Sequence, residues 1–180
     1  MTKPFEALPQ SYDRTQIALH WIIAVLIFGL YAVGLSVDLF DKPVRPFIVN
    51  LHAVFGLLLL FLVVVRIFWR VTHESPPLPA SMGPFFQKAA AAGHGLLYLL
   101  TLAIPLVGVP AFLLRGRPLD LGLFQIPAPF EANRDLAHQV TEFHGLLANI
   151  LIALVVGHVL VALYHQFVLR DGLLERIRPR

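Results

Sequence analysis

The chain has 180 residues, of which 57% are hydrophobic and only 14% are charged, and its formal net charge at pH 7 is +3. Soluble globular domains have about 45–50% apolar and about 25% charged residues, so this composition excludes an ordinary soluble domain. The sequence has no cysteine, which excludes disulfides, thiolate zinc sites and iron–sulfur clusters. We therefore attribute the positive charge to membrane topology rather than to nucleic-acid binding.

Four long segments contain no Asp, Glu, Lys or Arg: residues 15–37, 46–65, 89–114 and 143–169. Each reaches roughly the 20 residues that an α-helix needs to cross about 30 Å of hydrocarbon. The first is too long for the apolar part of a signal peptide, so we expect a retained helix. Because the connections are short, the sequence predicts one all-α integral membrane domain over residues 1–180. Its four transmembrane helices are expected at roughly 15–37, 46–70, 89–114 and 143–169.

Basic residues predict the orientation of these helices. Four spans place both termini and the connection after the second helix on one side, which carries nine Lys and Arg against five on the other. Excess Lys and Arg marks the cytoplasmic side, so both termini are expected in the cytoplasm. The longest external connection is expected to run from about Arg115 to Glu142. The nine residues are Lys3, Arg14, Arg66, Arg70, Lys88, Arg170, Arg176, Arg178 and Arg180.

Histidines at membrane depth are the main functional signal, because an ionisable residue there is costly and indicates a functional site. His20 is expected near the inner end of the first helix, and His52 near the outer end of the second. His144 is expected to open the fourth helix on the outer side. His158 follows fourteen residues later, which is about 21 Å deeper and, at close to four turns, on the same face. Two other histidines, His73 and His138, fall in predicted loops, where a solvated side chain is the simplest interpretation.

These positions sort four histidines into two pairs by depth, His20 with His158 at the inner level and His52 with His144 at the outer level. A six-coordinate haem requires an imidazole on each side of its iron, and bundle cores are a natural place for such sites. Zinc fits less well, because two histidines leave a tetrahedral site two ligands short. We interpret the pairs as axial ligands of two b-type haems. The alternatives are packed histidines bonded to carbonyl groups and, for the whole chain, a haem-free scaffold or transporter.

Three arginines are candidate partners for haem propionates, because arginine binds carboxylates through two parallel hydrogen bonds. Arg66 lies fourteen residues after His52 and on the same helix face, near the inner level. Arg70 is one turn closer to the cytoplasm, and Arg14 precedes His20. The alternative interpretation is that these side chains extend to lipid headgroups. Glycines beside the histidines leave room for a macrocycle, although they also promote helix packing: Gly56, Gly145 and Gly157.

At these residues the sequence resembles the bacterial cytochrome b561 family. The resemblance covers nearly the whole chain, and it implies haem ligation by the same four histidines. Phe143, before His144, departs from the family, where we expect Trp. The matching stretches are YDRTQIALHW (12–21), NLHAVFG (50–56), VVRIFWR (64–70), GHGLLYLLTLAIPLVG (93–108), EAN (131–133) and the pair His144 and His158.

The resemblance is greatest to the superoxide oxidases of this family. It implies an oxidoreductase of the bacterial inner membrane that moves electrons from superoxide at the periplasmic face to ubiquinone near the cytoplasmic face. Arg115, Arg117 and Arg134 are then candidates for steering superoxide, and His165 and His94 for the quinone site. The alternative is a cytochrome b subunit that links a dehydrogenase or hydrogenase partner to the quinone pool. The visible chain offers no docking domain for such a redox protein partner, and nucleic acid is not an expected partner.

Overall fold

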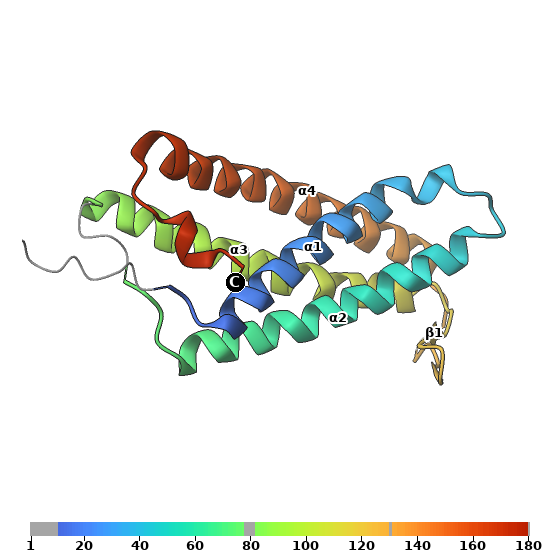
Figure 1. The fold of residues 1–180 in the computed structure, drawn as a ribbon. Coiled ribbons are helices and arrows are strands. Elements are labelled where there is room, and N and C mark those ends of the chain that lie inside the picture. Colours follow the sequence, from blue (N-terminus) through green and yellow to red (C-terminus); the bar gives the residue numbers. More distant parts are fainter. Residues whose placement is uncertain (1–10, 78–81, 130, 180) are drawn as a thin grey trace, which may run out of the picture.

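The computed structural model describes residues 11–77, 82–129 and 131–179, so Lys3 and Arg180 of the charge count lie outside it. Its long helices are α1 (Arg14–Ser36), α2 (Arg45–Thr72), α3 (Pro84–Leu113) and α4 (Arg134–Tyr164). All four are long and apolar enough to cross a membrane, and they run side by side along the molecule (Figure 1). The predicted all-α bundle with four membrane spans is confirmed.

Short elements occur at the ends of these helices. A 3-10 turn, η1 (Val37–Leu39), extends α1, and a π-helical turn, η2 (His165–Leu169), extends α4. Strands β1 (Leu119–Asp120) and β2 (Gln125–Ile126) form an antiparallel hairpin, with Leu119 opposite Ile126 and Asp120 opposite Gln125. A second 3-10 turn, η3 (Leu174–Ile177), lies near the C-terminus.

The helix starts follow local capping chemistry. The Asp13 side chain accepts the Gln16 amide hydrogen at 2.9 Å before α1, and the Asn133 side chain accepts that of Leu136 at 3.0 Å before α4. Such side-chain acceptors satisfy amide groups that have no partner within the helix. α2 and α3 have proline in their first turn, where a missing N–H costs nothing.

α4 begins earlier than the hydropathy pattern predicts, at Arg134 instead of residue 143. The predicted external connection from Arg115 to Glu142 is therefore too long, and His138 lies in a helix rather than in a loop. His144 lies about three turns into α4 and does not open it. The physical reason is that the first turns of α4 are largely polar. The cap at Asn133 starts the helix before the apolar segment begins, so hydropathy does not reveal these first turns. α3 similarly begins five residues before its predicted start.

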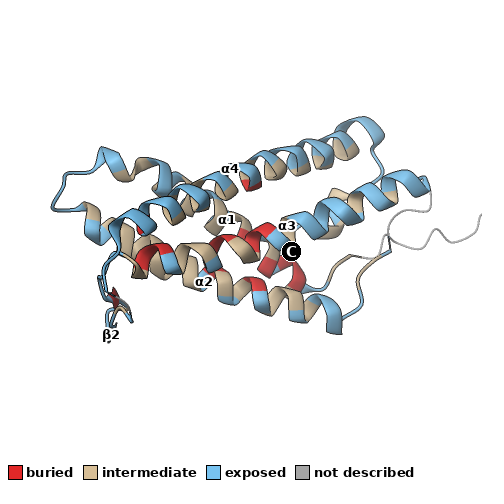
Figure 2. Ribbon diagram, turned by 180° about the vertical axis from the view of Figure 1, so that it is seen from behind, coloured by how far each residue is buried: buried red, intermediate tan, exposed pale blue. Residues whose placement is uncertain are grey.

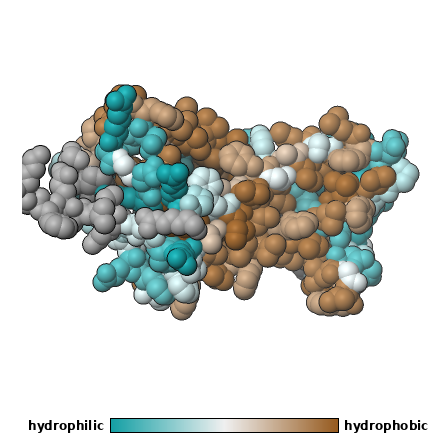
Figure 3. All heavy atoms as spheres, in the orientation of Figure 1, coloured by the Kyte–Doolittle hydropathy of each residue, from teal (hydrophilic) through white to brown (hydrophobic). Residues whose placement is uncertain are grey.

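The bundle has a thin core and a largely apolar exterior. α3 packs against α4, α1 against α2, and α2 against α3, whereas close backbone contacts of α4 with α1 and α2 are sparse among the described residues. Few residues are buried (Figure 2). A hydrophobic band occupies the middle of the molecule between more polar ends (Figure 3). Exposed apolar surface on this scale indicates contact with lipid.

The C-terminal segment ties several elements together at one end of the bundle. The Arg176 carbonyl accepts the Tyr12 amide hydrogen at 3.1 Å, and the Arg176 guanidinium donates to the Pro77 carbonyl at 2.6 Å. The Trp21 indole donates to the Ile177 carbonyl at 2.9 Å. We call this end, which the charge count predicts to be cytoplasmic, the inner end. The outer end holds the α1–α2 turn, the hairpin and the start of α4 (Figure 1).

Candidate functional site

Two pairs of imidazoles lie inside the bundle, and each joins α4 to another helix. The ring centroids of His20 on α1 and His158 on α4 are 6.4 Å apart. Those of His52 on α2 and His144 on α4 are 6.0 Å apart. All four residues are only partly exposed. The structure thus brings together the same pairs that the depth argument predicts, across the side of α4 where backbone contacts are sparse.

The spacing within each pair fits two ligands on opposite sides of one metal ion. A metal–imidazole bond is about 2 Å long and the ring centre lies about 1 Å further, so two such rings have centres roughly 6 Å apart. The ring planes are inclined by 59° and 78°, which rotation about the metal–nitrogen bonds allows. Within the described ranges, no group of three or more His, Asp and Glu could hold a metal ion. Two imidazoles facing each other in a pair therefore fit a haem, whose macrocycle supplies the other ligands, better than a tetrahedral metal.

His144 is held in one orientation by α3. Its Nδ1 lies 2.9 Å from the Ile104 carbonyl oxygen, so Nδ1–H donates there and Nε2 is left free. Metal-binding histidines usually donate their second nitrogen in this way. Gly108 of α3 lies directly against the ring: a Cβ at this position would be 2.9 Å from His144 Cε1. Neither contact is predictable from the sequence, because nothing in the spacing of α3 shows which residues face α4.

His52, the partner of His144, has its Nδ1 buried without a close hydrogen-bond partner among the described residues. The Leu30 backbone nevertheless lies near this ring. Gly34 of α1 faces this ring. A Cβ atom at this position would lie 3.7 Å from His52 Cε1. Two residues before His52, the Asn50 side chain holds the hairpin. Its amide donates to the Asp120 carbonyl at 2.8 Å, and its oxygen accepts the Asp120 amide hydrogen at 2.9 Å.

At the inner level a guanidinium lies against the histidines. Nη2 of Arg66 is 3.1 Å from Nδ1 of His20, and its Nε donates to the Tyr98 hydroxyl at 3.2 Å. His94 is also here, with its ring centroid 5.5 Å from that of His158. Arg66 is therefore the predicted propionate partner that the structure places beside the inner pair. His94, a candidate for the quinone site, lies against a paired histidine instead of beside His165.

The other two candidate propionate partners lie further out. The Arg70 guanidinium is over the Tyr12 ring, 5.7 Å from its centroid. Arg14 is the first residue of α1 and is exposed. These positions at the inner end are compatible with contacts to lipid headgroups, the alternative interpretation given above.

An aliphatic layer separates the two histidine levels. Ile27, Leu59 and Leu151 each lie seven residues from a paired histidine on the same helix. Leu59 and Leu151 are 6% and 5% exposed, and Ile27 packs against both of the clusters that contain them. Seven residues are close to two turns, so each side chain lies on the histidine face of its helix. The layer places apolar side chains between the two levels.

At the outer end, the three arginines predicted to steer superoxide line one cavity of about 520 Å³, together with Ala137 and His138. Burial lowers the pKa of Arg115, and the charge of Arg117 lowers it further, as expected where cations gather. Arginine nevertheless keeps its charge in proteins. Arg115 also donates to the Thr141 hydroxyl at 3.3 Å.

The backbone between these arginines requires glycine. Gly116 has φ +69°, and a Cβ there would lie 2.7 Å from the Ala132 Cβ. Any side chain at this position would be strained and would push the segment before α4 away from the end of α3. The turn at Gly116 thus places Arg115 and Arg117 beside Arg134.

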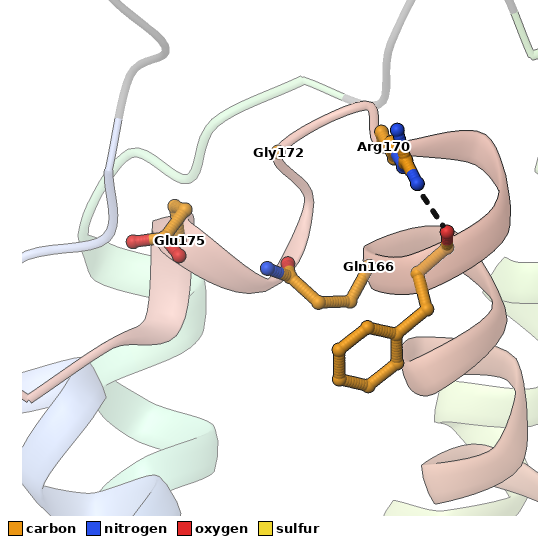
Figure 4. Close-up of a pocket in the computed structure, with 5 residues that line it drawn as sticks. Gln166, Arg170, Gly172 and Glu175 are labelled. Carbon is orange, nitrogen blue, oxygen red and sulfur yellow. Dashed lines mark hydrogen bonds between the residues drawn. The ribbon is translucent and has the colours of Figure 1, made fainter.

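At the inner end, a cavity of about 320 Å³ lies beside η2 and is lined by Gln166, Phe167, Arg170, Gly172 and Glu175 (Figure 4). The Arg170 Nε donates to the Phe167 carbonyl at 3.3 Å along its rim. His165, the predicted quinone ligand, immediately precedes these residues and pairs with Asp171. The sequence analysis did not identify Asp171.

A bundle of four membrane spans whose interior presents imidazoles in pairs has the features of a membrane cytochrome of the b type. The comparison with known families agrees with this class. The chain belongs to the prokaryotic cytochrome b561 family, whose model matches residues 11–180.

Several curated relatives match over nearly their full length. A probable superoxide oxidase CybB from Yersinia pestis is 30% identical, over 95% of this chain and 97% of the relative. Cytochrome b561 homolog 2 from Escherichia coli is 34% identical, over 96% and 94%. Cytochrome b562 from Cereibacter sphaeroides is 36% identical, over 94% and 97%. The chain is therefore a multi-pass electron-transfer protein of the bacterial inner membrane that binds haem b.

Proposed function

We propose that the chain is a superoxide:quinone oxidoreductase that binds two haem b groups. In this proposal electrons pass from superoxide at the outer end to ubiquinone near the inner end. The observation that carries the proposal is the pairing of imidazoles at two depths along α4, with ring centres 6.4 and 6.0 Å apart. The similarity to a probable superoxide oxidase supports the choice of donor.

His20 and His158 would hold one haem, and His52 and His144 the other. When bound, haem b supplies reversible one-electron redox chemistry. Because each haem would be held by two imidazoles, the pairs would keep dioxygen and superoxide off the metal and would favour outer-sphere electron transfer. The Ile104 carbonyl orients the outer pair by accepting the Nδ1–H of His144.

The outer cavity supports an anionic donor. Its three arginines, Arg115, Arg117 and Arg134, concentrate positive charge in a concave site at the start of α4, roughly two to three turns before His144. Such a site raises the local concentration of an anion and its rate of encounter, more strongly at low ionic strength. A neutral donor would gain nothing from this arrangement.

The inner cavity supports a quinone acceptor. Its volume, about 320 Å³, is at the lower end of the roughly 300–1,000 Å³ typical of small-molecule sites. Phe167 offers an apolar surface to a ring, and the Gln166 amide and the Arg170 guanidinium offer donors to carbonyl oxygens (Figure 4). η2 places this cavity at the end of α4, roughly two to three turns beyond His158.

The proposal is tested by an optical titration of the purified full-length chain in detergent, followed by stopped-flow kinetics. We expect about two haems per chain, fast saturable reduction by superoxide, and reoxidation by ubiquinone-1. A colourless, folded preparation would exclude a cytochrome. Slow reduction by superoxide that does not saturate, with normal reoxidation by quinone, would favour a protein donor and hence the alternative of a cytochrome b subunit.

A further inference from the structure

Asp171 is the partner of His165 at the inner end; the residue is exposed, but its side chain is partly covered by this contact. His165 Nδ1 lies 2.6 Å from Asp171 Oδ2, with the two side chains 12% and 23% exposed. The other carboxylate oxygen, Oδ1, accepts the Leu173 amide hydrogen at 3.1 Å. Burial raises the pKa of Asp171, but the hydrogen bonds from His165 and Leu173 outweigh it and hold this pKa below its usual value. The carboxylate is therefore charged.

The backbone around this pair is built to bring Asp171 back to His165. α4 passes into the π-helical turn η2, which begins at His165, and a single π-helical turn is often found at a functional site. Arg170 then adopts a left-handed conformation with φ 52°, and Gly172 has φ +72°. These residues reverse the chain. The tail that follows is fixed to other elements through Arg176, which keeps Asp171 in place.

This geometry determines which nitrogen of His165 can act. Because Nδ1 donates its hydrogen to Asp171, Nε2 is the free nitrogen. A carboxylate in this position orients the imidazole and fixes which nitrogen carries the hydrogen, without becoming protonated itself. Nε2 can then give a proton to a nearby oxygen and regain one from water, as in general acid–base catalysis.

We propose that Asp171 is a positioning residue that holds His165 as the proton donor to a quinone, and that the pair forms the proton-uptake site of the inner end. This inference rests on the proposed function. Reduction of one quinone to quinol takes up two electrons and two protons. Two superoxide anions supply the electrons and become two molecules of dioxygen. The protons come one at a time from the inner aqueous phase through Nε2 of His165, and Asp171 is unchanged at the end.

The cavity proposed for the quinone follows the pair along the chain. Its lining residues are Gln166, Phe167, Arg170, Gly172 and Glu175, which come directly after His165 and on either side of Asp171 (Figure 4). A quinone in this cavity would therefore lie between the end of the membrane span and the chain reversal that carries the pair. Protons need to travel only from the inner surface, whereas the two histidine levels lie deeper in the bundle.

The test compares two acceptors for the reduced, haem-loaded full-length protein, with haem reoxidation followed optically. Ubiquinone-1 needs protons and ferricyanide does not. For Asp171→Asn and Asp171→Ala we expect kcat with ubiquinone-1 to fall roughly ten- to a hundredfold. This is less than the roughly 10²–10⁴-fold contributed by a general acid itself, because His165 is still present. KM should change by less than about twofold, because uniform binding is untouched. Ferricyanide rates should equal those of the wild type, and added formate should restore part of the rate in Asp171→Ala. Glu74→Gln, an exposed carboxylate at the inner end, is the matched control.

The remaining outcomes overturn the proposal, and they do so for distinguishable reasons. Wild-type kcat in both Asp171 variants would show that the pair does not supply the proton. Equal losses with both acceptors, and no rescue by formate, would show a purely structural role. If the wild type itself is reoxidised by ferricyanide but not by ubiquinone-1, the quinone acceptor of the proposed function is wrong, and the proton-uptake role is wrong with it.

Discussion

Gly108 offers a test of the outer histidine pair that leaves every candidate ligand in place. In Gly108→Ala the new Cβ would lie 2.9 Å from Cε1 and 3.0 Å from Nδ1 of His144. Carbon atoms in contact are normally at least about 3.5 Å apart, so the ring must move by about 0.6 Å. Metal–ligand distances tolerate only about 0.2 Å. We therefore expect that His144, although present, no longer binds the haem at the normal distance.

Gly108→Ala should change the free energy of unfolding only slightly, so a loss of haem would not be due to misfolding. Moving the ring weakens the bond to the Ile104 carbonyl, at a cost of about 0.5–1.5 kcal/mol. Replacing glycine by alanine within a helix contributes about 1 kcal/mol in the opposite direction. The two terms nearly cancel, so the variant should fold and insert normally.

Gly34→Ala is the matched control, because its Cβ would lie 3.7 Å from His52 Cε1, an ordinary contact. The assay is haem content per chain together with the low-spin optical and electron paramagnetic resonance signals. In Gly108→Ala the haem content should fall from about two per chain toward about one, or the signal of the outer site should be altered. Gly34→Ala should match the wild type in both measurements. Two unaltered haem signals in Gly108→Ala would refute the placement of His144 against α3.

Three further predictions concern other parts of the molecule. His20→Ala should lose about half of the bound haem by pyridine haemochrome assay, whereas His138→Ala should retain all of it; full occupancy in the first variant would contradict the inner pair. Arg134→Gln should slow reduction by superoxide about three- to tenfold at low ionic strength and flatten its salt dependence, whereas Arg45→Gln, already paired with an aspartate, should not. Arg176→Leu removes the 2.6 Å bond to the α2–α3 connection, so limited proteolysis should cleave the tail faster, and an unchanged rate would count against its fixation.

The membrane spans and the histidine pairs could be predicted because both depend on local properties of the sequence. Hydropathy over about 20 residues identifies a span without any knowledge of its neighbours. The fourteen residues from His144 to His158 fix both their separation and their shared face, since a helix has a constant rise and twist. The charge count then places His20 near the inner end of its helix and His52 near the outer end of its own. None of these steps requires the packing of one helix against another.

Contacts that depend on helix rotation could not be predicted in this way. Gly108 and the Ile104 carbonyl face His144 only because α3 presents one particular face to α4. Asp171 meets His165 only because the chain reverses after a π-helical turn, and six residues of separation do not indicate such a turn. The start of α4 at Arg134 was missed for a different reason, since its first turns are helical without being apolar.

α4 is the element that relates all of these features to one another. It provides one histidine to each level, its first turns line the outer cavity, and its last turn leads into η2 and the inner cavity. The distance between the two levels is therefore set within a single helix, whereas the facing histidines come from two different helices. Leu151, buried midway between the two α4 histidines, anchors this helix to α3. A shift of α4 along α3 would displace His144 and His158 together by the same amount. The spacing that electron transfer depends on is thus protected from the looser packing of α4 against α1 and α2.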